Sequence, residues 1–272
     1  MIPTESFFKT TIGNTGKPVT RLGFSATYRP GKKTIYKALN EGINFFFCYG
    51  FDYQLIKVLR DVMKGNRENI VVATGAYNML YGHPNLRRTL EKRLRQLGTD
   101  YIDMFLFLGV LKPEHFGEKE IEELYRFREE GKIKHLGISC HDRKFLGQLA
   151  DKGTIDALML RYNAAHRGAE KDIFPFLKNH NPFVISYTAT RWRYLLQKPN
   201  NYTANDRIPT AGDCYRFVLT NPNVNVCLTA PSNEKHLADN IKAFREGPLD
   251  EEDMQFMQKF GDLVYGMKKW FM

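Results

Sequence analysis

Side chains that can act as acids, bases or nucleophiles follow the ends of short apolar runs in this sequence. Tyr49 ends one such run, and the neighbours Cys140 and His141 stand at the end of another. A phenol can serve as a general acid, a thiolate as a nucleophile and an imidazole as a general base. These three residues are the candidate catalytic groups. Because a reactive thiol needs a lowered pKa, Cys140, beside His141 and near Arg161, is the best-placed cysteine.

Arginine and aromatic residues occupy further positions at the ends of these runs. The pocket candidates are Phe47, Cys48, Gly75, Leu108, Arg161, Tyr162, Asn163, Arg191 and Trp192. Guanidinium groups grip carboxylate or phosphate, and aromatic rings stack on flat faces, so we expect a small anionic or aromatic ligand. Structural explanations stay open beside this one: Arg161 could pair with a carboxylate such as Asp103, and Trp192 could pack a loop.

Composition narrows the class of protein. The chain has 272 residues, of which 43% are hydrophobic, and a formal net charge of +10. Lys and Arg are scattered rather than clustered, so we expect no nucleic-acid partner. No apolar run approaches the roughly 20 residues that cross a membrane, and the N-terminus lacks a signal-peptide core, so a cytoplasmic location is expected. Four cysteines without a CxxC pair indicate neither a disulfide framework nor a metal site.

The sequence predicts strands and helices in alternation, and these elements would position the candidate residues. Apolar runs typical of buried parallel strands lie at residues 21–27, 43–49, 69–75, 101–108, 133–140, 155–162, 183–190 and 224–230. Helical patterns lie at residues 33–41, 53–63, 84–97, 121–130, 143–151, 169–178, 213–220 and 234–244. Strict alternation of eight strands with eight helices predicts an α/β protein with a closed (β/α)8 TIM barrel.

Two additions flank the predicted barrel, which we assign as a single domain over residues 1–272. Residues 7–20 read as a β-hairpin around Asn14-Thr15-Gly16 that could close the bottom of the barrel. Residues 248–271 form one more amphipathic segment, predicted as an extra C-terminal helix. Barrel enzymes carry their sites at the C-terminal ends of the strands, where all the candidate residues above fall. The sequence leaves the oligomeric state open.

Six segments carry a resemblance to a known family. They read TIGNTGKPVTRLGF, KALNEGINFF, LRQLGTDYIDMFLF, EEGKIKHLGIS, RYNAAHRGAE and EKHLADN. GTDYID and GKIKHLGIS, in this order and at this spacing, are the most specific of them. With these segments the chain resembles the aldo/keto reductases, barrel oxidoreductases that use NADP(H). The resemblance extends over residues 9–260.

That family reduces carbonyl groups with a tetrad of Asp, Tyr, Lys and His, and this chain departs from the tetrad. The resemblance places Phe47 at the Asp position, Gly75 at the Lys position and Leu108 at the His position. Tyr49-Gly50 resembles the family's Tyr-Gly pair but stands earlier in the chain. A phenol needs a close cation to release its proton near neutral pH. Carbonyl reduction by the family's mechanism is therefore not expected.

The resemblance also implies positions for the cofactor, which are partly retained. Ser139 matches a residue that holds the nicotinamide amide, and Tyr187 matches the aromatic residue that stacks under the nicotinamide. Asn233 and Asn240 match on the adenine side, whereas Ser232 stands where the family has the Arg that pairs with the 2′-phosphate. The resemblance thus leaves NADP binding open.

Three functions follow as hypotheses. The first is a reductase-like barrel that has lost the tetrad, a pseudoenzyme that binds a small anionic or aromatic ligand, NADP among the candidates. The second is an enzyme of altered chemistry, either an NADP(H)-dependent oxidoreductase or a lyase or isomerase with relocated catalytic groups. The third is a non-catalytic protein that binds a partner.

Overall fold

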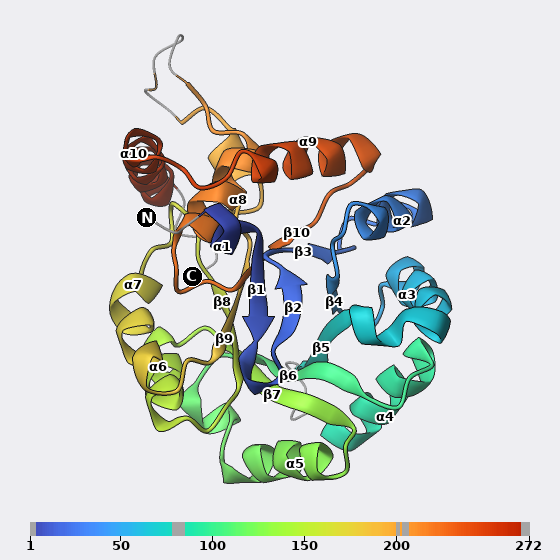
Figure 1. Cartoon of the computed structure of the whole chain (residues 1–272). Coiled ribbons are helices and arrows are strands. Elements are labelled where there is room, and N and C mark those ends of the chain that lie inside the picture. Colours follow the sequence, from blue (N-terminus) through green and yellow to red (C-terminus); the bar gives the residue numbers. More distant parts are fainter. Residues whose placement is uncertain (1–3, 78–84, 200–201, 203–206, 268–272) are drawn as a thin grey trace.

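Eight parallel strands close into a barrel, with β10 pairing with both β9 and β3. The computed structural model describes residues 4–77, 85–199, 202 and 207–267. The barrel strands are β3 (Leu22–Ser25), β4 (Phe45–Cys48), β5 (Val71–Tyr77), β6 (Ile102–Val110), β7 (Ile133–Cys140), β8 (Ala157–Arg161), β9 (Phe183–Tyr187) and β10 (Val226–Thr229). Neighbouring strands follow chain order around the barrel (Figure 1), which is the topology that the alternation predicts.

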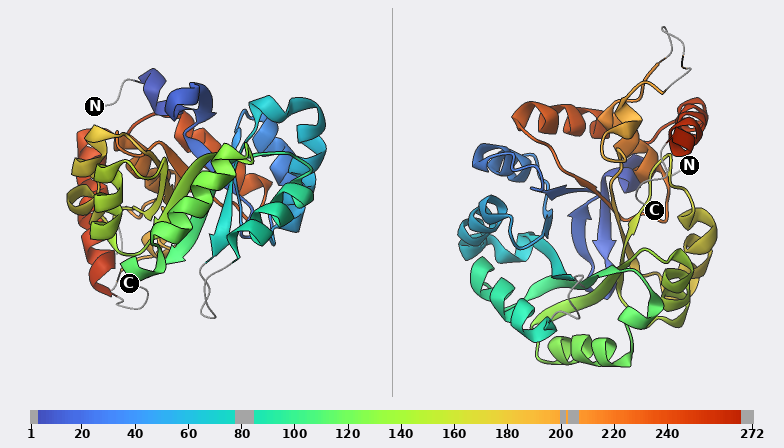
Figure 2. Two further views of the ribbon diagram at one scale, coloured as in Figure 1. Left: turned by 90° about the horizontal axis from the view of Figure 1, so that it is seen from below. Right: turned by 180° about the vertical axis from the view of Figure 1, so that it is seen from behind.

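Helices surround the strands on all sides, as Figure 2 shows from two further directions. They are α2 (Lys32–Asn40), α3 (Tyr53–Asn66), α4 (Leu86–Leu97), α5 (Glu118–Glu129), α6 (Arg143–Lys152), α7 (Ala169–Asp172), α8 (Ala211–Thr220) and α9 (Glu234–Arg245). The (β/α)8 barrel is therefore confirmed. One expected helix, over residues 169–178, is instead the short α7 followed by a 3-10 helix at Phe174–Asn179, which has Pro175 in its first turn. Proline lacks the N–H that would continue α7. The first residue of the helix expected over 84–97 lies outside the described residues.

Alternation along the strands separates an inner from an outer apolar layer. In β4, Phe45 and Phe47 belong to the cluster inside the barrel, whereas Phe46 and Cys48 belong to the larger cluster under the helices. The same period of two recurs in the other strands. The inner cluster also includes Met104, Leu106, Leu108, Met159, Ile185 and Leu228. The barrel interior is thus a packed core, which leaves the open C-terminal end as the place where a site can form.

A hairpin lies across the opposite opening, in the foreground of Figure 1. Helix α1 (Thr4–Phe8) precedes β1 (Lys9–Ile12), which pairs antiparallel with β2 (Lys17–Thr20). Ile12 and Val19 of this hairpin are buried and belong to the inner cluster. The hairpin therefore closes the N-terminal end of the barrel, as the sequence predicts.

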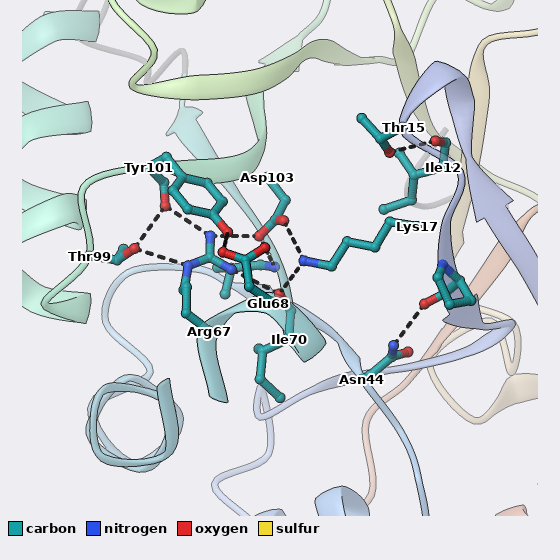
Figure 3. A network of polar contacts seen from close by, with 12 residues as sticks. Ile12, Thr15, Lys17, Asn44, Arg67, Glu68, Ile70, Thr99, Tyr101 and Asp103 are labelled. Carbon is teal, nitrogen blue, oxygen red and sulfur yellow. Dashed lines mark hydrogen bonds and ion pairs between the residues drawn. The ribbon is translucent and has the colours of Figure 1, made fainter. Parts of the chain in front are cut away.

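A buried carboxylate ties this hairpin to the strands (Figure 3). Asp103, at the start of β6, accepts hydrogen bonds from Lys17 (3.1 Å), Arg67 (2.8 Å) and the backbone N–H of Val72 (2.9 Å). The suggestion that Asp103 pairs with Arg161 is therefore wrong. Asp103 lies at the N-terminal end of β6, whereas Arg161 ends β8 at the other opening.

The chain continues after the barrel with α10 (Glu251–Met267), which confirms the extra C-terminal helix up to that residue. The remainder of the expected segment, up to residue 271, lies outside the described residues. Met257, Phe260 and Val264 are buried and anchor α10 to the barrel flank. Among the described residues, no helix combines the length and the apolar character needed to cross a bilayer.

Candidate functional site

A cavity of about 900 Å³ opens at the C-terminal ends of the barrel strands. Ser25, Tyr49, Tyr187 and Leu228 line its end over the barrel, and the cavity continues from there between α8 and α9. Its charged lining residues are Arg193, Arg207, Asp213, Asp239, Lys242 and Glu246. A volume of this size is typical of a site for a cofactor or drug-sized ligand.

The groove between α8 and α9 depends on small residues. A side chain at Gly212 of α8 would overlap the Cβ atom of Ala243 in α9, so the glycine allows the two helices to approach closely. Asn240, buried in α9, donates a hydrogen bond to Thr229 at the end of β10 (3.0 Å) and lines the cavity. Asn233 is the N-cap of α9 and accepts a hydrogen bond from the N–H of His236 (2.9 Å).

Apolar groups fill the part of the barrel mouth below Tyr49. Phe47 and Leu108 are buried in the inner cluster. A Cβ atom at Gly75 would overlap the carbonyl oxygen of Leu106 and would lie 2.9 Å from Cγ of Leu108. The space next to Gly75 is therefore already occupied by backbone and by the Leu108 side chain.

Two stacked tyrosines cover this apolar floor. The rings of Tyr49 and Tyr77 lie 5.8 Å apart between centroids at 11°, and Phe47 meets Tyr49 edge to face at 4.9 Å. Burial raises the pKa of Tyr49 and outweighs its hydrogen bond with Tyr77, which lowers it. Burial also raises the pKa of Tyr77. Sequence reasoning missed Tyr77, although it stands at the next inward position of β5 after Gly75.

A second group of polar side chains lies at the ends of β7, β8 and β9. Arg161 pairs in register with Tyr187, and its guanidinium lies over the ring of Trp192, 5.0 Å from the centroid. Burial raises the pKa of Tyr187, against the lowering effect of the Arg161 charge and of hydrogen bonds to Ser139 and Arg161. The structure thus brings together four residues that the sequence analysis singled out.

The candidate thiols do not have the surroundings of a nucleophile. Burial raises the pKa of Cys140 to about 11, although its Sγ accepts a hydrogen bond from the N–H of Asp142 (3.3 Å). Burial raises the pKa of Cys48 as well. Both sulfur atoms belong to the layer between strands and helices. His141 is exposed at the end of β7, where desolvation and the charge of Arg161 lower its pKa.

Three other pocket candidates serve the packing around the mouth. Tyr162 is buried under the helices and donates to Glu170 (2.7 Å). The side chain of Asn163 donates to the carbonyl oxygen of Thr188 (2.8 Å), and Arg191 donates to the carbonyl oxygen of Val264 in α10. These side chains hold loops in place, and a direct role in ligand binding stays a prediction for them.

The loop after β9 has an unusual backbone. Thr188, Arg191, Trp192 and Arg193 have φ angles of 57°, 48°, 51° and 73°, the left-handed region that glycine favours. Thr188 and Trp192 line the cavity. Non-glycine residues persist in this region where surrounding contacts hold them, and such strain gathers at functional sites.

Comparisons with known proteins agree with this architecture. A family model described as "Aldo/keto reductase family" matches residues 29–207. The chain is 24% identical over 238 residues to an "Uncharacterized oxidoreductase YqkF" of Bacillus subtilis, which covers 74% of this chain and 77% of that protein.

Two solved structures share the fold over nearly the full length of both chains. The holo form of the aldo-keto reductase AKR11C1 from Bacillus halodurans has a TM-score of 0.77 at 22% identity, covering 93% of this chain and 95% of that one. An aldo/keto reductase from Klebsiella pneumoniae in complex with NADP and acetate has a TM-score of 0.72 at 22% identity, with the same coverage. Because the family model matches more than half of its residues, this chain belongs to the aldo/keto reductase family.

Proposed function

We propose that this protein binds NADP(H) in the cavity between the barrel mouth and helices α8 and α9, and that it does not reduce carbonyl groups by the family's usual mechanism. The observation that carries the proposal is the contrast between the two parts of the mouth. The cavity is open from Tyr187 to Asn240, whereas Phe47, Gly75 and Leu108 form a closed apolar floor.

The residues that line the cavity fit a dinucleotide in size and chemistry. A volume of about 900 Å³ is sufficient for such a ligand. Tyr187 offers a ring face at the end over the barrel, and Ser232, His236 and Lys242 offer polar groups at the far end. When bound, NADPH would supply a hydride. A relative solved with NADP and acetate supports this assignment.

Proton donation is the step of carbonyl reduction that we expect this chain to lack. A carbonyl that accepts a hydride also needs a proton, and Tyr49 is the candidate donor among the tyrosines that line the cavity. Apart from burial, the groups that affect its pKa within the described part of the chain are Tyr77, Tyr187, Asp52 and Tyr28, none of which is a cation. A neutral phenol with a raised pKa is a weak acid, and loss of a positioned general acid typically costs ~10²–10⁴ in rate.

Binding is tested by titrating the protein with NADPH and following cofactor fluorescence. We expect saturable binding with Kd below ~100 μM, on the order of −5 to −6 kcal/mol. Ser232→Arg restores a guanidinium where the family binds the 2′-phosphate, so it should tighten NADPH binding several-fold and leave NADH binding unchanged.

The matched control is Gln148→Arg, which adds the same charge on the exposed face of α6. It should change neither affinity. Absence of saturable NADPH binding by the wild-type protein would contradict the proposed function. An equal gain for NADPH with both arginine variants would show that net charge, rather than the cavity, determines affinity.

A further inference from the structure

The side of the barrel formed by helices α2, α3 and α4 carries most of the positive charge of the molecule. These helices are consecutive around the barrel and lie side by side in both Figure 1 and Figure 2. Together they contain eleven Lys or Arg residues and two acids, in a chain whose formal net charge is +10. On another side of the barrel, α10 contains four acids and one lysine. The fold therefore gathers on one side cations that are scattered along the sequence.

Seven of these cations are exposed on the outer faces of the three helices, and we call them the basic flank. They are Lys32 and Lys33 of α2, Lys57 and Arg60 of α3, and Arg88, Lys92 and Arg95 of α4. Spacings of three and four residues place the cations of α3 in one row and those of α4 in another. The Cγ atom of Arg60 lies 3.3 Å from the position that a Cβ atom of Gly98, the C-cap of α4, would take. The two rows are therefore adjacent.

The acids of these helices do not neutralise the basic flank. Asp61 pairs with Lys64 (3.7 Å), and Glu91 pairs with Lys132 (2.6 Å). Cations in the first turn of α2 oppose its helix dipole, and like charges four residues apart on α4 repel each other. This arrangement is unfavourable in the protein alone and becomes favourable when an anionic partner lies on it.

The side chains around the basic flank distinguish between classes of anionic partner. Protein interfaces have an apolar centre and few lysines, and a helix that lies on a membrane inserts Trp, Phe or Leu side chains. Among the described residues of α2, α3 and α4, the exposed large hydrophobic side chains are those of Tyr36 and Tyr53. Phe51, in the loop before α3, packs against Tyr49 at the barrel mouth. A surface rich in Lys and Arg and poor in apolar groups is typical of contacts with nucleic acid.

We propose that the basic flank binds the backbone phosphates of nucleic acid without reading the base sequence. Lys and Arg form charge-assisted hydrogen bonds with phosphate oxygens, which position a nucleic acid but do not distinguish bases. Helix α3 has 14 residues and is therefore about 21 Å long. A DNA duplex carries one charge per ~1.7 Å of its axis, so the rows of cations span several phosphates.

This inference does not rest on the proposed function. None of the seven cations is among the residues that line the cavity at the barrel mouth. The expectation of no nucleic-acid partner followed from the scattered positions of Lys and Arg in the sequence, whereas the proposal follows from their positions in the fold.

The test measures how the full-length protein binds a fluorescein-labelled DNA duplex of mixed sequence, by fluorescence anisotropy at salt concentrations between about 50 and 200 mM. We expect Kd of about 10⁻⁴–10⁻⁶ M near physiological salt. Each neutralised phosphate contributes about −0.9 to the slope of log K against the logarithm of salt concentration, so we expect a slope between about −3 and −6. A slope near zero would overturn the proposal.

Two matched pairs of lysine substitutions locate the contact. Lys57→Gln together with Lys92→Gln removes one charge from α3 and one from α4. We expect the slope to become less steep by about two and the affinity at low salt to fall at least ten-fold. Lys144→Gln together with Lys152→Gln removes the same charge from exposed positions of α6 and should leave Kd within two-fold. All four lysines are exposed, so both variants should keep the melting temperature of the wild-type protein.

Further outcomes decide for or against the basic flank. Equal losses in the two double variants would show that net charge attracts the duplex and would overturn the proposal. Tighter binding of an RNA duplex or of a single strand, with the same dependence on Lys57 and Lys92, would support it and identify the source of the phosphates. Binding to vesicles of phosphatidylcholine and phosphatidylserine, without binding to any of these nucleic acids, would overturn it in favour of a membrane surface.

Discussion

The neighbours of Tyr49 determine how easily its phenol can release a proton. Its ring is packed against Phe47 and Tyr77 at the edge of the cavity, and burial raises its pKa. A nearby ammonium or guanidinium would act in the opposite direction. The residue type that catalysis needs is thus present, but its surroundings favour the neutral form. This is the physical basis for proposing that the family's chemistry is lost.

His166 provides a pH-dependent test of the packing around the mouth, because desolvation by burial, and after it the charges of three arginines, lower its pKa. Its pKa is about 4 in the folded protein, whereas an unperturbed imidazole has a pKa of about 6.5. Between these values the unfolded chain binds the proton and the folded chain does not, so the free energy of unfolding falls as the pH is lowered from 6.5 to 4. Because the imidazole is only partly buried, solvent screening reduces this effect, and we expect a loss on the order of 1 kcal/mol.

Urea unfolding at pH 7 and pH 4 measures this effect. His166→Gln removes the titrating group and should reduce the difference between the two pH values. NMR titration of the wild-type protein gives the pKa directly. A His166 resonance that titrates near pH 6.5 would contradict the prediction.

At the level of elements, the same alternation that predicts the strands also determines which residues can reach the site. Positions 71, 73, 75 and 77 of β5 share one face, so Tyr77 reaches the mouth beside Tyr49. The apolar run was expected to end at Gly75, and Tyr77 was therefore missed. Outward positions such as Cys48 are directed under the helices by the same rule. Strand identity could be predicted from the apolar runs, whereas strand ends could not, because tyrosine suits both strands and loops.

A substitution at Gly75 tests whether the apolar floor of the barrel mouth is closed. Gly75→Ala would place a methyl group onto the backbone of β6, so β5 and β6 must separate. We expect a loss of about 2 kcal/mol or more in the free energy of unfolding. Gly65→Ala in α3 is the control, since nothing lies within 4 Å of its Cβ atom, and it should stabilise the protein by about 0.5–1 kcal/mol. Denaturant unfolding compares the two, and an equal response would refute the steric argument.

A substitution at Asp103 tests how the hairpin is attached to the barrel. Its carboxylate is 4% exposed and pairs with both Lys17 and Arg67. Asp103→Asn leaves these two cations without their anion, and we expect a loss of about 3–5 kcal/mol. Asp239→Asn breaks an exposed pair with Lys235 and should have little effect. Thermal unfolding monitored by circular dichroism distinguishes them, and similar melting temperatures would contradict a structural role for Asp103.

At the scale of the whole molecule, the barrel could be predicted because eight buried strands in alternation with helices favour one topology. The cavity could not, because it depends on how closely α8 and α9 approach at Gly212 and Ala243. Contacts between residues that are remote in sequence could not be predicted either. An example is the hydrogen bond that Lys17 of the hairpin donates to Asp103. The local sequence pattern determines the strands and helices, whereas the packing of these elements against one another creates the cavity.

The central claim is that the open cavity and the closed floor occur in one protein, so that cofactor binding is separated from carbonyl reduction. It is tested most directly by saturating the protein with NADPH, adding a generic aldehyde and following absorbance at the cofactor's reduced band. We predict that the rate of NADPH consumption equals the rate without protein. A rate that rises in proportion to protein concentration and disappears in Tyr49→Phe would contradict the account.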